Sequence, residues 1–313
     1  MGFILIFGVS ALLGITLGAN DAGNVFGTAV ATRFVRYRTA CVLTFIFVVI
    51  GAVLQGSKGI ETLSGITPQN VNTSVLVGFV VGIVGFILSL LGQPISLSQA
   101  VVGGLIGLGL SQNKVEWEIL WKVLICWAFT PLGAGIIAII CYKILFVFLS
   151  HLRMGILTRE TLIRRGLLLS GVIGAYSLGA NNVANTVGMF SGTIKDVSNM
   201  ELALLGGVFI GIGVLLFSKP VMMNVGKGIV ILDGFSAFVV VLSSSVTVYI
   251  FSLVGVPVST TQAVVGAIVG IGIHHGVHTL QFKVIKDILL SWLVAPIACL
   301  VFVSAGYAIF INK

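Results

Sequence analysis

Charged side chains are scarce in this chain of 313 residues. Its 17 Lys or Arg and 9 Asp or Glu make up 8% of the sequence, whereas a typical soluble domain has about 25%. So few charges cannot cover the surface of the one or two soluble domains that the length alone would allow. Hydrophobic residues make up 58%, and the mean hydropathy is +1.18. The composition therefore predicts a protein that crosses the membrane several times.

The hydrophobic segments also lack the alternation of apolar and polar residues that a membrane β-barrel needs. Apolar runs instead continue for about 20 residues, the length of a membrane-spanning helix. The 40 glycines agree with this interpretation, because small residues let helices pack closely in lipid. We therefore expect an all-α polytopic membrane protein with about 10–12 membrane segments.

Several motifs of enzymes and cofactor proteins are missing. The sequence has no Walker loop, no Gly-x-Ser-x-Gly and no His-Glu-x-x-His, so neither an enzyme nor a resident cofactor is expected. The four cysteines occur singly in apolar runs, which favours packing roles over metal binding. The net charge of +8 is too dilute for a nucleic-acid surface. Without a nucleotide site, active transport would have to be coupled to an ion gradient.

Three sequence blocks of the first half recur in the same order in the second half. They are the Gly-Ala-Asn motifs (GANDAGN at 18–24, GANNVAN at 179–185), the Pro-x-Ser motifs (PISLSQ at 94–99, PVSTTQ at 257–262) and Trp127-x-x-x-Pro131 with Trp292-x-x-x-Pro296. Three blocks in register indicate a duplication. We expect one repeat at 1–150, a basic cytoplasmic linker at 151–165 and a second repeat at 166–313.

The Lys and Arg residues gather in a few short connections. Placing Arg33, Arg36, Arg38 and the 151–165 linker in the cytoplasm satisfies the positive-inside rule along the whole chain. This path puts both termini outside the cell and makes the two repeats enter the plasma membrane from opposite sides. Inverted repeats with broken helices or re-entrant hairpins are typical of secondary transporters.

Each Gly-Ala-Asn motif falls within an apolar run. Gly disfavours a helix interior and Asn prefers turns, so we expect the helix to break there and to line a polar cavity. Oxygen ligands of this kind suit a small hard cation. The predicted sodium ligands are Asn20, Asp21, Asn24, Asn181, Asn182 and Asn185. A polar clasp between helices is the alternative, but a carboxylate such as Asp21 is costly in a membrane and favours a functional site.

The Pro-x-Ser motifs suit an anion. Each proline ends an apolar run, and the hydroxyl residues behind it are good N-caps for a following helix. Free N–H groups and the positive end of the helix dipole then face an anion. The predicted phosphate-binding residues are Ser96, Ser98, Gln99, Ser259, Thr260, Thr261 and Gln262. Capping without a ligand is the alternative.

These paired motifs resemble those of the inorganic phosphate transporter (PiT) family over essentially the whole chain. The resemblance implies phosphate uptake driven by sodium or protons, termini outside the cell and an oligomer such as a homodimer. Many relatives have Asp at the position of Asn182, and many have His at the positions of Gln99 and Gln262. The missing histidines remove groups that titrate near neutral pH, which favours sodium over protons.

The sequence therefore predicts a secondary transporter that imports inorganic phosphate together with sodium ions, by alternating access around a midplane site. Proton coupling and transport of sulfate or another oxyanion are alternatives of the same class. An ion channel is a less favoured alternative, because two inverted half-sites that close around one central ligand argue against an open pore.

Overall fold

The computed structural model describes residues 2–31, 33–90, 96–152, 154–193, 197–224, 232–276 and 282–311. Within these ranges it contains helices and no strands. The helices are α1 (Gly2–Ala31), α2 (Tyr37–Ser64), α3 (Val71–Leu90), α4 (Leu97–Gln112), α5 (Trp117–His151), α6 (Ile156–Val187), a 3-10 turn (Gly188–Phe190), α7 (Asn199–Phe217), α8 (Lys219–Asn224), α9 (Gly234–Val254), α10 (Thr260–His275) and α11 (Phe282–Phe310). Eight of the described helices are long and apolar enough to cross a membrane. The predicted all-α membrane fold is confirmed.

The predicted breaks at the Gly-Ala-Asn motifs are wrong. Helix α1 runs without interruption through residues 18–24, and α6 runs through 179–185. The motif glycines serve close packing instead. A Cβ atom on Gly18 would overlap the main-chain carbonyl of Ile210 in α7, and one on Gly179 would overlap that of Val48 in α2. Helix propensity is a weak preference that this packing overrides.

Part of the predicted linker is also helical. Helix α5 ends at His151 and α6 already begins at Ile156, so the basic residues that follow Ile156 lie in the first turns of α6. Pro94, predicted to end the apolar run before α4, lies outside the described residues.

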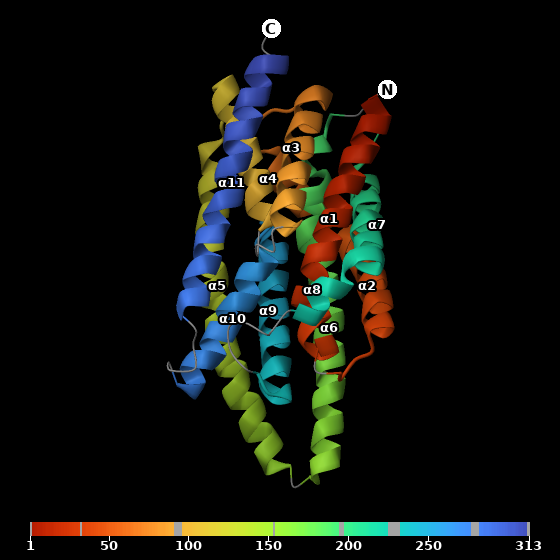
Figure 1. The fold of residues 1–313 in the computed structure, drawn as a ribbon, viewed down its shortest axis with the longest axis vertical. Coiled ribbons are helices and arrows are strands. Elements are labelled where there is room, and N and C mark those ends of the chain that lie inside the picture. Colours follow the sequence, from red (N-terminus) through yellow and green to blue (C-terminus); the bar gives the residue numbers. More distant parts are fainter. Residues whose placement is uncertain are drawn as a thin grey trace.

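Two helical hairpins enter the bundle from opposite ends. The α3–α4 hairpin occupies the end where α1 begins and α11 ends, and the α9–α10 hairpin occupies the other end (Figure 1). Helices α4 and α10 have 16 residues each and are about 24 Å long, shorter than the hydrocarbon core of a bilayer. Their N-terminal ends meet at mid-height, where the Ser98 hydroxyl donates to the carbonyl of Val258 at 3.2 Å. Both hairpins are therefore re-entrant in shape.

The two halves of the chain are interlocked. Helix α4 packs on α11, α10 on α5, α1 on α7 and α2 on α6, so each of these pairs joins one half to the other. The glycines of α4 and α10 allow this contact: Gly103 lies against the main chain of Pro296, and Gly266 lies against that of Pro131. The corresponding helices also run in opposite directions, since α1 and α6, and likewise α5 and α11, are antiparallel (Figure 1).

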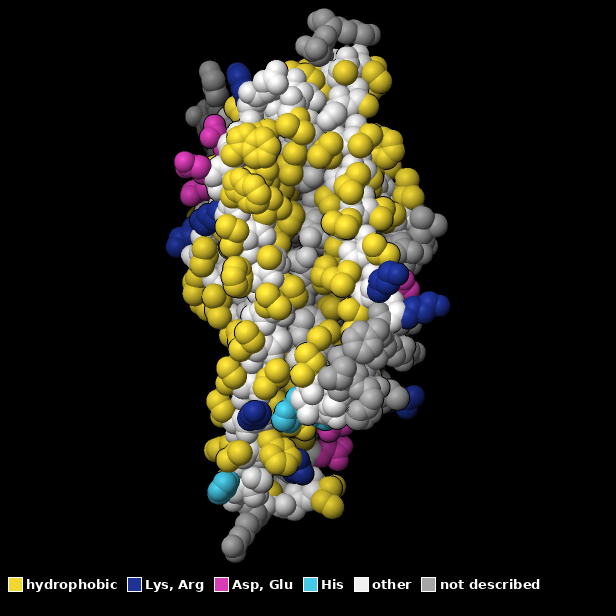
Figure 2. Space-filling view, turned by 90° about the vertical axis from the view of Figure 1, so that its left-hand side faces the viewer, with side chains coloured by type: hydrophobic (Ala, Val, Ile, Leu, Met, Phe, Trp, Pro, Cys, Tyr) yellow, Lys and Arg dark blue, Asp and Glu magenta, His cyan; other side chains and the backbone are white. Residues whose placement is uncertain are grey.

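The outer surface is apolar along most of the molecule. Figure 2 shows a face covered by hydrophobic side chains, with charged groups mainly toward its edges and ends. On α5 the exposed apolar residues follow the helix repeat, as Trp121, Ile125, Phe129, Leu132 and Ile136 show. A stripe of this kind faces lipid in a membrane protein.

Candidate functional site

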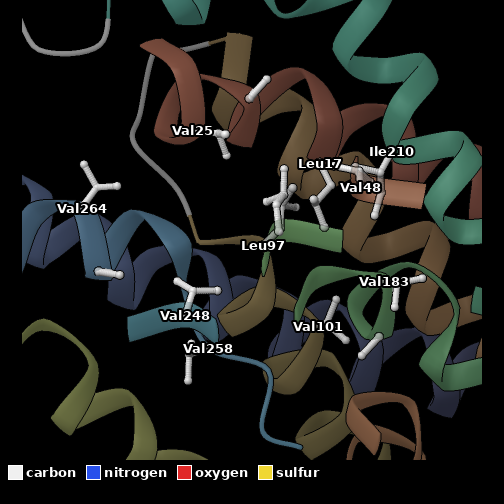
Figure 3. Packing of buried hydrophobic residues seen from close by; sticks show 14 of the residues in the cluster. Leu17, Val25, Val48, Leu97, Val101, Val183, Ile210, Val248, Val258 and Val264 are labelled. Carbon is white, nitrogen blue, oxygen red and sulfur yellow. The ribbon is translucent and has the colours of Figure 1, made fainter. Parts of the chain in front are cut away.

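The candidate site lies where the second half of α1, the C-terminal turns of α6 and the N-terminal ends of α4 and α10 meet. The long helices supply the two Gly-Ala-Asn motifs, and the hairpins supply the first residues of α4 and α10. Buried apolar side chains beside these polar residues, including Leu97, Val258 and Leu17, belong to one packed hydrophobic cluster (Figure 3). The site is thus held by packed helices from both halves.

Asp21 is the single carboxylate that the described residues place at this centre. Its side chain is 6% exposed. Its Oδ2 atom accepts hydrogen bonds from the Asn182 amide at 2.6 Å and the Thr260 hydroxyl at 3.0 Å, and its Oδ1 atom accepts one from the Asn20 amide at 3.2 Å. The described partners are all neutral amide or hydroxyl groups. Hydrogen bonds from neutral groups place this carboxylate firmly, and no Lys or Arg among the described residues bonds to it.

The asparagines hold the hairpin tips in two matching ways. Asn24 in α1 donates to the Thr261 hydroxyl of α10 at 3.2 Å, and its counterpart Asn185 in α6 donates to the Ser98 hydroxyl of α4 at 2.8 Å. Because Ser98 and Thr261 occupy equivalent positions in the repeated motif, the two contacts are related by the repeat. Each long helix therefore binds the hairpin of the other half.

Asn181 makes a pair of main-chain contacts at the second tip. Its amide donates to the carbonyl of Val258 at 2.7 Å, and its side-chain oxygen accepts from the Val258 N–H at 2.9 Å. The Trp127 indole donates to the neighbouring carbonyl of Pro257 at 3.1 Å. These bonds satisfy non-helical main-chain groups that would otherwise be buried without partners. They also fix the α9–α10 tip against the site.

Ser96 and Ser259 cap the two short helices. Each serine hydroxyl accepts a hydrogen bond from the main-chain N–H of the glutamine three residues later, at 3.4 Å for Gln99 and 3.3 Å for Gln262. The caps satisfy one free N–H group at the start of each helix and fix where α4 and α10 begin. The predicted capping geometry is thus present at both tips.

Within the part of the chain that the structure describes, three side-chain oxygens of the site are buried and accept no hydrogen bond. They are Gln99 Oε1, Gln262 Oε1 and Asn185 Oδ1, on side chains that are 7%, 5% and 1% exposed. A buried acceptor without a donor costs free energy. Within the described ranges no three His, Cys, Asp or Glu side chains gather as a metal site. The donor set is therefore one carboxylate with neutral carbonyl and hydroxyl oxygens, which suits a hard cation of low charge.

The structure brings all the predicted site residues to one region, but it does not separate them into a cation group and an anion group. Asp21, predicted as a sodium ligand, is hydrogen-bonded to Thr260, predicted as a phosphate ligand. Sequence reasoning missed the part played by the Val258 main chain, because a valine in a tip carries no polar side chain. In the sequence, Trp127 was recognised only as part of a repeated motif. A buried indole N–H needs a hydrogen-bond acceptor, and the structure shows that the carbonyl of Pro257 accepts from it.

Comparisons with known proteins agree with this architecture. The family model described as the phosphate transporter family matches residues 17–303. A protein of Methanocaldococcus jannaschii named as a candidate phosphate permease is 32% identical over 94% of this chain and 93% of its own. The sulfate permease CysP of Bacillus subtilis is 29% identical over 92% of this chain and 82% of its own. A solved structure described as the sodium-dependent phosphate transporter superposes with a TM-score of 0.89 at 23% identity, covering 98% of both chains.

A helical bundle with re-entrant hairpins around a buried polar centre, together with these matches, defines a membrane transporter and not an enzyme. More specifically, the chain belongs to the phosphate transporter family.

Proposed function

We propose that this protein is a symporter that carries inorganic phosphate together with sodium ions, by alternating access around the polar centre at Asp21. The observation that carries the proposal is the burial of this carboxylate among neutral hydrogen-bond partners. Asp21 is buried and bonded to neutral groups from both halves of the chain. Phosphate would add further negative charge in a region of low dielectric. The two anions can share the site when cations lie between them.

Sodium fits the oxygens that the site leaves without partners. The carbonyl oxygens of Gln99, Gln262 and Asn185 and the carboxylate of Asp21 are hard ligands for a small cation. A bound cation would also remove the cost of leaving the three acceptors buried and unsatisfied. In this arrangement the glutamine oxygens face cations, and their amide nitrogens remain able to donate to an oxyanion.

Phosphate fits the ends of the two capped helices. The N-terminal ends of α4 and α10 meet at mid-height with the hydroxyls of Ser98, Thr260 and Thr261. Main-chain N–H groups and the helix dipole at such ends stabilise an anion without a Lys or Arg. Because the tips come from opposite directions, they can surround a tetrahedral anion from two sides.

The interlocked architecture supports alternating access between two inverted repeats. Each hairpin reaches the centre from one end of the molecule (Figure 1) and packs on the long helix of the other half. Displacement of one hairpin from the centre would open the site toward one end while the other hairpin still closes it. This is the mechanism expected of inverted-repeat transporters.

Sulfate transport is the second candidate, because the similarity to a protein named sulfate permease covers most of this chain. Phosphate keeps at least one exchangeable proton at neutral pH and can donate an O–H, whereas sulfate cannot. A site that holds buried oxygen acceptors favours the anion that can donate.

Labelled phosphate uptake into proteoliposomes tests both alternatives. We expect concentrative uptake under an inward sodium gradient, no concentrative uptake under a proton gradient alone, and weak competition by excess sulfate. Concentrative uptake without a sodium gradient would overturn sodium coupling. Stronger inhibition by sulfate than by unlabelled phosphate would make sulfate the substrate.

A further inference from the structure

A polar cavity that is open to the surface lies between α2, α5 and the end of α9. It has a volume of about 440 Å³ and is lined by Lys58, Glu61, Thr62, Ile119, Lys122, Val254 and Gly255. This volume is well above the roughly 10–15 Å³ that a cavity needs to hold one water molecule. We call it the two-lysine vestibule. None of the site residues described above lines it.

The charges of the vestibule favour an anion. Two ammonium groups face one carboxylate, and both lysines are exposed. Lys58 Nζ donates to the carbonyl of Leu253 at 3.5 Å, and Lys122 Nζ donates to that of Val254 at 3.4 Å. An ammonium group has three donors, so each lysine keeps two for a ligand. The Thr62 hydroxyl lies at the same place, bonded to the carbonyl of Gly255 at 2.6 Å.

The vestibule adjoins the central site through the tip of the second hairpin. Gly255 lines the cavity, and Val258, three residues later, bonds to Asn181. Three residues of chain span at most about 11 Å. On the α2 side, Gly59 follows Lys58 directly and packs on Ala184, within the Gly-Ala-Asn motif of α6. An anion in the vestibule would therefore be one short segment of chain away from the centre.

Capping alone does not account for this arrangement. Cations do stabilise the last carbonyls of a helix, and both lysines make such contacts at the end of α9. A cap, however, needs no open volume, and here two lysines from different helices flank a cavity large enough for a solvated oxyanion. The long hydrogen bonds of 3.5 and 3.4 Å would yield readily to a charged ligand.

We propose that the two-lysine vestibule is a docking site where free phosphate binds through Lys58 and Lys122 before it reaches the central site. This inference rests on the proposed function, and it adds a step that requires no sodium. Positive charge at such a place raises the local concentration of an anionic substrate and speeds its association, more strongly at low ionic strength. The docking site would bind phosphate that arrives from the side of the molecule to which the vestibule opens.

Binding of labelled phosphate to the full chain in nanodiscs of neutral lipid tests the dock. The measurement is made at low ionic strength, once with sodium and once with choline in its place. We expect a sodium-independent component in the wild type that is lost in K58Q/K122Q and kept in K58R/K122R. Lys114→Gln is the matched control, because Lys114 is also exposed, precedes α5 and does not line the cavity. In uptake assays, we expect each Gln substitution to raise the half-saturating phosphate concentration about two- to fivefold without lowering the maximal rate.

The outcomes separate the dock from the proposed function. Equal sodium-independent binding in K58Q/K122Q and wild type, or none in the wild type, would overturn the dock. Loss of that binding when anionic lipid is added would also overturn it, since a lipid headgroup would then hold the cavity. Absence of a sodium-stimulated component would overturn symport instead, while lysine-dependent binding in choline would still support the dock.

Discussion

The charge of Asp21 is the feature on which sodium coupling depends at the residue scale. Asp21→Asn keeps an oxygen able to accept from Asn182 and Thr260 but removes the negative charge that attracts a cation. We expect the apparent sodium affinity to fall about tenfold or more, the effect of losing one contact to a charged group. The measurement is phosphate binding as a function of sodium concentration. An unchanged sodium dependence would exclude Asp21 as a cation ligand.

Moving the carboxylate from position 21 to the equivalent position 182 of the second repeat provides a control. In the double variant D21N/N182D the charge returns to the same hydrogen-bonded pair but lies on α6. Thr260 donates to Asp21, whereas the residue at the equivalent position in the first motif is Leu97, which cannot donate. We expect partial recovery of sodium dependence in D21N/N182D, and further recovery when Leu97→Thr is added. No recovery in either variant would mean that the repeat is not functionally symmetric.

The unpartnered oxygen of Gln262 leads to a prediction that separates stability from binding. Gln262→Met keeps the length of the side chain and removes a buried acceptor that lacks a donor. We expect an unchanged or higher Tm in the absence of sodium and phosphate, because the cost of the unsatisfied oxygen disappears. The shift in Tm caused by sodium with phosphate should shrink, since about 1–3 kcal/mol of binding free energy is lost.

Gln55 offers the matched control for this variant. Its side-chain oxygen is also buried without a partner, but it belongs to neither repeated motif. Gln55→Met should behave like Gln262→Met without ligand and keep the wild-type shift with ligand. If Gln262→Met also keeps the full shift, its oxygen does not contact the bound ions.

Which residues form the centre could be read from the sequence, whereas their contacts could not. A polar side chain in an apolar run needs a partner, so the repeated Asn, Ser, Thr and Gln residues identified the region. The direct bond between Asp21 and Asn182 depends on how α1 crosses α6, and no local pattern encodes that crossing. The individual roles of these residues stay predictions.

At the scale of the helices, close packing of α1 on α7 gives a prediction about Gly18. A Cβ atom at this position would overlap the carbonyl of Ile210, so Gly18→Ala must push the two helices apart. We expect a loss of about 1–3 kcal/mol or more from overpacking, seen as a lower Tm of the purified protein and weaker phosphate binding.

Gly8 lies in the same helix and has no atom within 4 Å of an added Cβ. Gly8→Ala should therefore leave the Tm unchanged or raise it, because Ala favours a helix. If Gly18→Ala and Gly8→Ala lower the Tm equally, helix flexibility and not the contact with α7 would explain why position 18 is a glycine.

The same glycines show where sequence reasoning about elements succeeds and fails. Apolar runs predicted the spans and the hairpins well, because the length of an apolar run can be read directly from the sequence. The breaks in α1 and α6 were predicted from the helix propensity of Gly and the turn preference of Asn, and they are absent because close packing of Gly18 on α7 and of Gly179 on α2 favours continuous helices. In lipid, a glycine inside a helix can instead mark the place where a second helix passes, as Gly103 and Gly266 also do.

At the scale of the whole molecule, interlocking of the halves distinguishes this fold from two linked domains. The motifs of one half bind the hairpin of the other, through Asn24 with Thr261 and Asn185 with Ser98. Neither half therefore contains a complete site. A duplicated sequence indicates that the same order of elements occurs twice. It does not show that the motifs of one half bind the hairpin of the other, because that depends on long-range packing.

The course of α5 allows a test of how the molecule lies in the membrane. This helix has 35 residues and is about 50 Å long, well beyond the roughly 30 Å of the hydrocarbon core. Lys114 precedes it, and Arg159 lies at its far end in the first turns of α6; both side chains are exposed. The positive-inside rule puts Lys114 outside the cell and Arg159 inside.

Single cysteines at these two positions report the side directly. They are introduced into a variant whose native Cys41, Cys126, Cys141 and Cys299 are replaced by Ala and which retains phosphate uptake. We expect a membrane-impermeant maleimide to label K114C on intact cells and R159C after permeabilisation alone, because a charged reagent cannot cross the bilayer. Labelling of both cysteines on intact cells would refute the transmembrane course of α5. The reverse pattern would keep that course, but it would place the basic connection between α5 and α6 outside the cell and both termini in the cytoplasm.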